Sequence, residues 1–108
     1  MSKNEGIREI TMSRAQRPPE HLEIIGLRLR AARMALDCSS GEFAASIDIA
    51  PNTYSQWESG ARLLDPLAAI RMCEQHKLSM DWFYRGDAFT LPHGIVKDVL
   101  ANFRKLSR

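Results

Sequence analysis

The stretch IAPNTYSQWESG, from Ile49 to Gly60, decides how the middle of the chain is divided into helices. Proline is unfavourable inside a helix but favourable at its first position, where the missing N–H would have no partner. Pro51 therefore predicts the start of a helix, and Gly60 predicts its end as a C-cap residue. Helical spacing then turns Tyr54 and Trp57 inward and leaves a polar outer face, made of Asn52, Ser55 and Gln56.

Two helices are predicted before this one. In residues 20–37, apolar residues at helical spacing indicate an amphipathic helix, carried by Leu22, Ile25, Leu29, Ala32 and Leu36. Ser39 and Glu42 are spaced as a capping box, which opens a short second helix. That helix is expected to bury Phe43, Ala44 and Ile47. Asp48 and Ile49 then form a tight turn.

Three further helices are predicted after Gly60. Asp65 and Pro66 open the fourth as its N-cap and first residue, with a buried side expected from Leu67, Ile70, Met72 or Cys73, and Leu78. Ser79 caps a short fifth helix that carries Trp82 and Phe83, and Gly86 ends it. After Pro92 a sixth, amphipathic helix is expected to use Ile95, Val96, Val99, Leu100, Phe103 and Leu106.

The helices define an all-α chain in three parts, since no strand pattern occurs. Residues 20–87 are expected to form a compact five-helix domain, and residues 88–108 a linker with the extra C-terminal amphipathic helix. Residues 1–19 contain four basic and two acidic side chains and are expected to be a flexible basic arm. Such an arm either reaches a DNA minor groove or is a solvated tail.

Composition narrows the class of protein. A chain of 108 residues suits one domain, and its net charge of +2 does not by itself indicate a nucleic-acid binder. No apolar run is long enough for a membrane span, and the N-terminus does not resemble a signal peptide. Two cysteines in this context favour reduced thiols and a cytoplasmic location.

Chemistry of the catalytic or metal-binding kind is not expected. The three histidines, His21, His76 and His93, fall in separate predicted elements without a nucleophile arrangement or a Gly-rich phosphate loop. Cys73 and His76 are three residues apart, but no second ligand pair accompanies them. The sequence therefore predicts neither an enzyme nor a metal or other cofactor.

The segments SSGEFAASIDIAPNTYSQWESG, Ser39 to Gly60, and LSMDWFYRGD, Leu78 to Asp87, carry a family resemblance. Together they resemble the phage repressor and Cro-like family of helix-turn-helix regulators, also called the xenobiotic-response-element family. The resemblance implies a five-helix DNA-binding domain, bacterial or phage-encoded, in which the helix over residues 51–59 enters the major groove of double-stranded DNA.

Site residues follow from the same resemblance. It implies base reading by Pro51, Asn52, Ser55 and Gln56, and phosphate contacts by Ser39, Ser40, Thr53 and Arg62. Asn and Gln can pair with adenine through two hydrogen bonds. Arg33 and Glu58 occupy positions that pair in the family and would fix the third helix. Three positions depart from the family pattern, namely Ser40, Asp48 and Ala50.

The aromatic residues Tyr54, Trp57 and Trp82 are expected to pack in the core rather than stack on bases, although the hydroxyl of Tyr54 could reach a phosphate at the rim.

The chain is also expected to form a homodimer. The resemblance places a homodimer interface around Met80 and Phe83. The C-terminal helix could dimerise or fold back onto its own domain, and its cations Arg104, Lys105 and Arg108 could grip phosphates. The predicted function is a sequence-specific transcriptional regulator, a homodimeric repressor on a palindromic operator. The alternative is an antitoxin that also binds a partner toxin through the N-terminal arm or the C-terminal helix.

Overall fold

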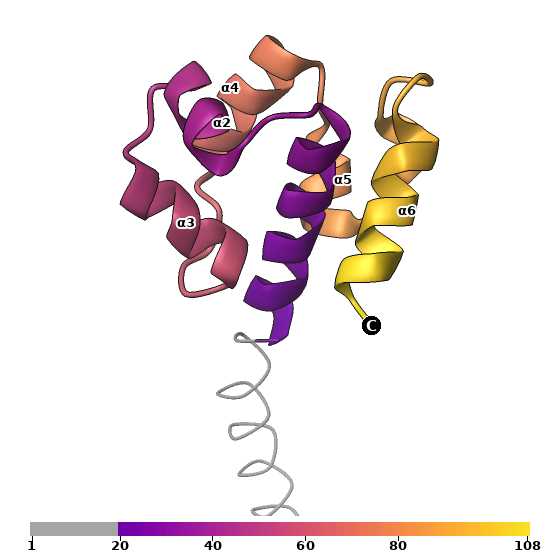
Figure 1. Ribbon diagram of the computed structural model, residues 1–108, viewed down its shortest axis with the longest axis horizontal. Helices are drawn as coiled ribbons and strands as arrows, with labels where there is room; N and C mark the ends of the chain where they lie inside the picture. The colour runs from indigo at the N-terminus through magenta and orange to yellow at the C-terminus, as the bar shows by residue number, and fades with distance from the viewer. Residues whose placement is uncertain (1–19) are drawn as a thin grey trace, which may run out of the picture.

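The computed structural model describes residues 20–108 as an arrangement of helices in which no strand occurs (Figure 1). Residues 20–35 are helical and form the first helix of this part of the chain. The elements that follow are α2 (Ser40–Ser46), α3 (Pro51–Ser59), α4 (Pro66–His76), α5 (Met80–Arg85), the short 3₁₀ helix η1 (Ala88–Thr90) and α6 (Val96–Leu106). The all-α class and the order of helices predicted from the sequence are confirmed, whereas η1 was not expected.

Local capping explains where these helices begin and end. The Ser39 hydroxyl accepts from the Glu42 N–H and the Glu42 carboxylate accepts from the Ser39 N–H, so the predicted capping box opens α2. Pro51 is the first residue of α3, and its N-cap, Ala50, offers no side-chain hydrogen bond. Gly60 ends α3 in the left-handed region, with φ of 83°. Asp65 and Ser79 cap α4 and α5 as predicted.

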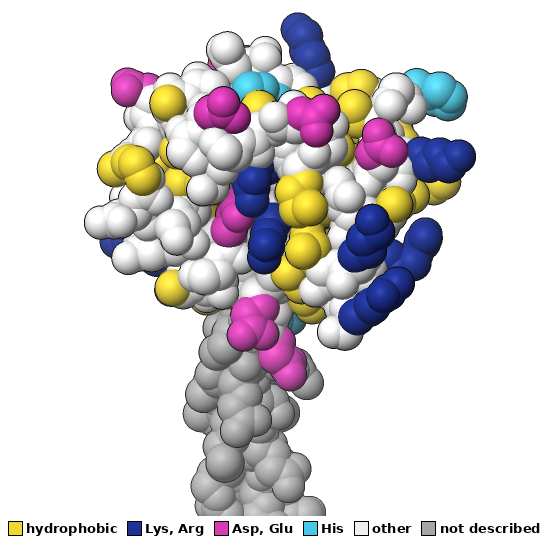
Figure 2. All heavy atoms as spheres, viewed as in Figure 1, with side chains coloured by type: hydrophobic (Ala, Val, Ile, Leu, Met, Phe, Trp, Pro, Cys, Tyr) yellow, Lys and Arg dark blue, Asp and Glu magenta, His cyan; other side chains and the backbone are white. Residues whose placement is uncertain are grey.

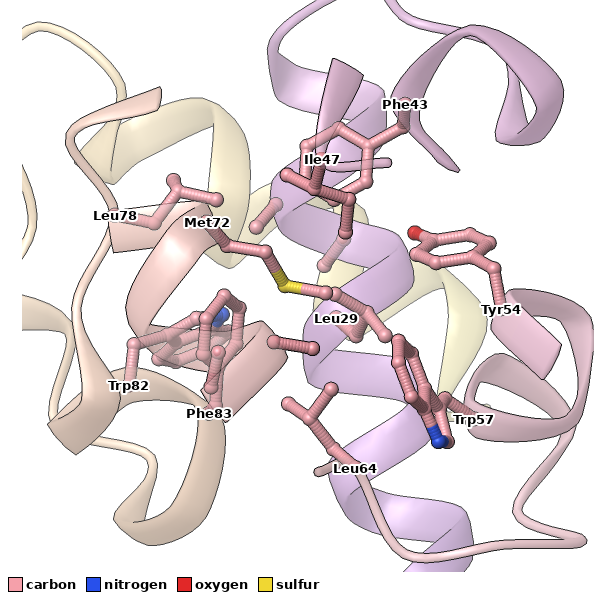
Figure 3. Packing of buried hydrophobic residues seen from close by; sticks show 14 of the residues in the cluster. Leu29, Phe43, Ile47, Tyr54, Trp57, Leu64, Met72, Leu78, Trp82 and Phe83 are labelled. Atoms are coloured by element: carbon pink, nitrogen blue, oxygen red, sulfur yellow. The ribbon is translucent and has the colours of Figure 1, made fainter. Parts of the chain in front are cut away.

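The core forms around the first helix, whose Leu29 has no exposed surface. Figure 3 shows side chains from α2 and α3 on one side of this core and side chains from α4 and α5 on the other. The largest fully buried side chains are Trp82, Tyr54, Phe43, Phe83, Leu29, Leu64, Met72 and Val99. Burial of large apolar groups around one helix is the main stabilising contribution.

The buried side of α4 differs from the sequence expectation. Leu67 is 70% exposed and Ile70 is 41% exposed, so both were wrongly assigned to the core. The face that packs inward consists of Ala68, Ala69 and Met72. Helical spacing fixes the period of an apolar face but not its phase, and two adjacent alanines let α4 approach the core closely.

The C-terminal helix folds back onto its own domain, which was one of the two alternatives left open. Val99 of α6 is fully buried. The Asn102 side-chain amide donates to the Ala31 carbonyl of the first helix at 3.1 Å. The ring of Phe103 meets Trp82 edge-on, with centroids 5.8 Å apart. α6 therefore covers the side of the core formed by the first helix and α5 (Figure 1).

The N-terminal arm and membrane-spanning helices were the remaining structural expectations. The arm predicted for residues 1–19 lies outside the described residues. No helix within residues 20–108 combines the length and apolar character needed to cross a membrane.

Candidate nucleic-acid interface

The outer face of α3 presents the side chains predicted to read bases. Pro51, Asn52, Ser55 and Gln56 are all exposed, and they occupy the first two turns of the helix. Within residues 20–108 the side chains of Asn52, Ser55 and Gln56 take no part in any hydrogen bond. Tyr54 and Trp57 face the core on the opposite side. Polar groups that the fold does not use are thus gathered on one accessible face.

An ion pair fixes α3 to the first helix. Arg33 donates through Nε to Glu58 Oε2 at 2.7 Å and through Nη2 to Glu58 Oε1 at 3.2 Å. Its third nitrogen, Nη1, donates to the Cys38 carbonyl at 2.8 Å, just before α2. The hydrogen bond with Glu58 raises the pKa of Arg33 above its usual value. The predicted pair is confirmed, and it holds both helices of the helix-turn-helix unit.

Tyr54 takes part in the same network. Its hydroxyl donates to Glu58 Oε2, and the side chain has no exposed surface. The idea that this hydroxyl reaches a DNA phosphate at the rim is therefore wrong, because the group is buried and already bonded. Burial raises the pKa of Tyr54 far above that of a free tyrosine, so the hydroxyl keeps the proton that it donates.

Gly26 is a positioning residue that the sequence did not reveal. A Cβ atom at this position would lie 2.4 Å from the Glu58 carbonyl oxygen and 2.6 Å from that of Trp57. The first helix therefore contacts the backbone at the end of α3, which only glycine permits. The available signal was a glycine in the middle of an amphipathic helix, since such a residue costs stability unless packing requires it.

Side chains of α4 support the turn that precedes α3. Asp48 adopts φ of 58°, the left-handed conformation expected where the family pattern has glycine. Behind this turn, Arg71 of α4 donates to the Ile47 carbonyl at 3.2 Å. Phe43 of α2 stacks on His76 of α4 with ring centroids 4.6 Å apart. α2 is thereby held against α4 while α3 is held against the first helix.

The candidate phosphate contacts fall into two places. Ser39 and Ser40 are exposed at the start of α2, and the hydroxyl of Ser39 already accepts the capping bond while keeping its proton free to donate. Thr53 and Arg62 line one surface depression beside α3, together with Ile49, Trp57, Leu63, Leu64, Asp65 and Pro66. The structure thus brings Thr53 and Arg62 together, whereas the two serines lie at the start of α2 and do not line this depression.

Charge on this face is sparse. From Ser39 to Arg62 the chain has three carboxylates, on Glu42, Asp48 and Glu58, against the single guanidinium of Arg62. Figure 2 shows mostly uncharged side chains over α3. Glu58 is neutralised by Arg33, but Glu42 and Asp48 remain exposed. Within residues 39–62, Arg62 is therefore the one cation available to contact phosphates.

The two residues predicted for a dimer interface differ in their exposure to solvent. Met80 is half-buried, whereas Phe83 has no exposed surface within the single chain. The side chain of Phe83 packs in the core and cannot form the contact surface for a second copy in this conformation. Helical spacing alone did not separate these roles, because α5 has only six residues.

Comparison with known families agrees with this geometry. A family model described as "Helix-turn-helix" matches residues 29–83, which is 55 of the 108 residues. The comparisons with curated proteins and with solved structures gave no match. The matched region contains the capping box of α2, the turn at Asp48 and the whole of α3. The chain therefore belongs to the phage repressor and Cro-like helix-turn-helix family, whose domain binds DNA and is typically not an enzyme.

Proposed function

We propose that this protein is a sequence-specific transcriptional regulator that inserts α3 into the major groove of DNA. The observation that supports this most directly is that one part of α3 is anchored to the domain while another part exposes polar side chains. Asn52, Ser55 and Gln56 are exposed and unused by the fold, while Glu58 and the backbone beside Gly26 anchor the other end. A helix fixed at one end and polar at the other suits docking into a groove without rearrangement.

The exposed groups suit base edges. Asn52 and Gln56 can each donate and accept together, which matches the N6 and N7 positions of adenine. Ser55 can serve as donor or acceptor with any base, and Pro51 can pack against a thymine methyl group. Phosphate contacts would come from Ser39, Ser40, Thr53 and Arg62, which fix the register of the helix without reading sequence.

Repression by a homodimer is the finer part of the proposal. One recognition helix reads only a few base pairs, so specificity in a genome favours two copies on half-sites about one helical turn apart. Such an operator is palindromic. A dimer that occupies a promoter in the cytoplasm excludes RNA polymerase, which makes repression the direct outcome of binding.

Selection of bound duplexes from a random pool, at fixed salt concentration, tests the proposal. We expect an enriched palindromic motif with half-sites about ten base pairs apart, and a dimer in sedimentation equilibrium with that motif. Enrichment of no motif, with binding that falls steeply as salt rises, would reduce the protein to an electrostatic binder. Enrichment of a single half-site by a monomer would reject the homodimer alone.

A further inference from the structure

The outer face of α6 carries a line of cations. Lys97 and Arg104 are seven residues apart, about two helical turns, so they lie on one side of α6, opposite buried Val99, and Arg108 follows two residues after the end of the helix. Lys105 adjoins this line, and we call the four residues the α6 cation line. All four are exposed. Figure 2 shows Lys and Arg side chains gathered over α6.

These cations are not engaged within the described chain. α6 contains one acidic residue, Asp98. Among residues 20–108 the ion pairs are Arg33 with Glu58 and Arg85 with Asp81, so no member of the α6 cation line pairs with a carboxylate there. The concentration of unpaired positive charge on α6 contrasts with the acidic excess of the α2–α3 face.

The α6 cation line and the recognition helix lie on different sides of the molecule. Gly26 and Arg33 of the first helix contact α3, whereas its Ala31 accepts the hydrogen bond from Asn102 of α6. Five residues separate Gly26 from Ala31, which corresponds to a rotation of about 140° around the helix axis. Figure 1 agrees, because the first helix stands between α3 and α6. A straight duplex bound by α3 would not reach this line.

We propose that the α6 cation line binds the phosphate backbone of a second DNA duplex, so that the protein bridges two DNA segments. Each strand offers a phosphate about every 3.4 Å along the duplex axis. Lys97 and Arg104 are spaced by about 10 Å along α6, within reach of separate phosphates for long side chains. This contact is independent of sequence, because it involves phosphates and not base edges.

An acidic protein fits the same surface less well. Stable protein interfaces have an apolar centre from which charged residues are depleted. The apolar side chains that flank Lys97 and Arg104 on this face are the half-buried Ala101 and Leu100, which is 37% exposed, and no aromatic residue of α6 lies there. A row of cations beside one partly exposed leucine, with no aromatic anchor, is closer to the composition expected for binding a phosphate backbone than to the apolar centre of a protein interface.

A bridging assay with the full chain tests the inference. One short duplex is fixed to beads, and a fluorescent duplex of unrelated sequence is retained only if the protein holds both. The double variant Lys97→Gln/Arg104→Gln removes two cations of the line. The double variant Lys77→Gln/Arg85→Gln is the matched control, because it removes one Lys and one Arg from exposed positions outside α6.

Salt dependence gives the expected size of the effect. With four phosphate contacts, affinity for the second duplex should fall roughly 10²-fold between about 50 and 200 mM salt, and only about tenfold in the α6 double variant. The control should behave like the unaltered protein. All three proteins should keep nearly the same thermal midpoint, since the altered side chains are exposed and the solvent-exposed pair of Arg85 with Asp81 contributes little to stability.

The outcomes separate this inference from the proposed function. Loss of retention in the α6 double variant alone, with sequence selection by α3 unchanged, supports bridging. Equal retention by both variants, or no retention by the unaltered protein, overturns it. Capture of poly-glutamate but not of the second duplex would assign the line to an acidic protein and would also overturn it. Bridging could persist even if α3 proved to have no sequence preference.

Discussion

Glu58 is the residue through which α3 is fixed to the rest of the domain. Its two carboxylate oxygens accept from Arg33 and from the Tyr54 hydroxyl. The carboxylate is largely buried, with 12% of its side chain exposed. At such a site a charge is tolerated only with its partners in place. Arg33, Tyr54 and Glu58 therefore both fix α3 to the first helix and compensate the buried charge of the carboxylate.

Replacement of Arg33 by Met should lower the free energy of unfolding by about 3 kcal/mol, because Glu58 would be left buried and without its cation. Urea denaturation measures this change. The double variant Arg33→Met/Glu58→Gln is the control, and it should recover much of the loss because no buried charge remains and the amide oxygen can still accept from the Tyr54 hydroxyl. Equal destabilisation by the single and double variants would show that packing, rather than charge, is what Arg33 supplies.

Asn52 should contribute to sequence preference rather than to overall affinity. Asn52→Ala is expected to cost about 1–3 kcal/mol of binding free energy with the selected operator, and to relax the preference at one base pair. Binding of a panel of single-base operator variants measures this. Thr53→Val, at a predicted phosphate contact, should weaken binding to every duplex alike. If Asn52→Ala did the same, Asn52 would contact the DNA backbone.

At the level of elements, α3 is placed by the surface of the first helix. The backbone at Gly26 approaches the last turn of α3, and a Cβ atom at Gly60 would lie 2.8 Å from Glu23 Cα of the same helix. The two glycines therefore allow a close approach at the last turn of α3, away from the first two turns that carry Asn52, Ser55 and Gln56. A small shift at this contact would change the angle at which α3 projects.

Gly26→Ala should destabilise the fold by about 1–3 kcal/mol, because the added methyl group overlaps two backbone carbonyls that cannot easily move. Thermal denaturation measures the effect. Gly41→Ala is the matched control, since a Cβ there meets no atom within 4 Å. This second change lies within α2 and should stabilise the protein by about 0.5–1 kcal/mol. Comparable midpoints for the two variants would contradict the close contact.

Element boundaries could be predicted from the sequence because capping chemistry is local. Ser39 with Glu42, Pro51 and Gly60 mark their helix ends whatever lies around them. The buried face of α4 could not be predicted, because Leu67 and Ile70 have the right spacing but the wrong phase.

The roles of residues that act through tertiary contacts could not be predicted from the spacing of residues in the sequence. Gly26 acts through the distant carbonyls of α3, and Tyr54 bonds Glu58 rather than a phosphate. Arg33 and Glu58 were found through family resemblance, which carries tertiary information that spacing lacks. The assignment of Asn52, Ser55 and Gln56 to bases stays a prediction, since their exposure allows it without testing it.

For the whole molecule, the contact between α2 and α4 connects stability to pH. The Ser46 hydroxyl lies 2.6 Å from the Phe43 carbonyl oxygen and 2.7 Å from His76 Nε2. A hydroxyl has one proton, so donation to the carbonyl requires His76 to donate from Nε2. Burial lowers the pKa of His76 below its usual value of 6.5. The neutral ring is therefore the form that the fold prefers.

Acidification should destabilise the protein through this residue. As pH falls below about 6.5, the unfolded chain binds a proton that folded His76 resists, so stability declines until the pH passes the folded pKa. The urea midpoint should be lower at about pH 5.5 than at about pH 7.5. His76→Gln should reduce this difference, whereas His93→Gln, at an exposed position, should not. An unchanged difference in His76→Gln would assign the decline to other groups.

The separation of anchoring from exposed side chains in α3 has a practical consequence for redesign. Asn52, Ser55 and Gln56 are exposed and form no side-chain hydrogen bond within residues 20–108, so exchanging them should leave folding unaffected while the preferred operator changes. Variation at these three positions would therefore yield a set of regulators with one common scaffold and mutually independent targets. Such a set could operate side by side in one cell, because each member would ignore the operators of the others.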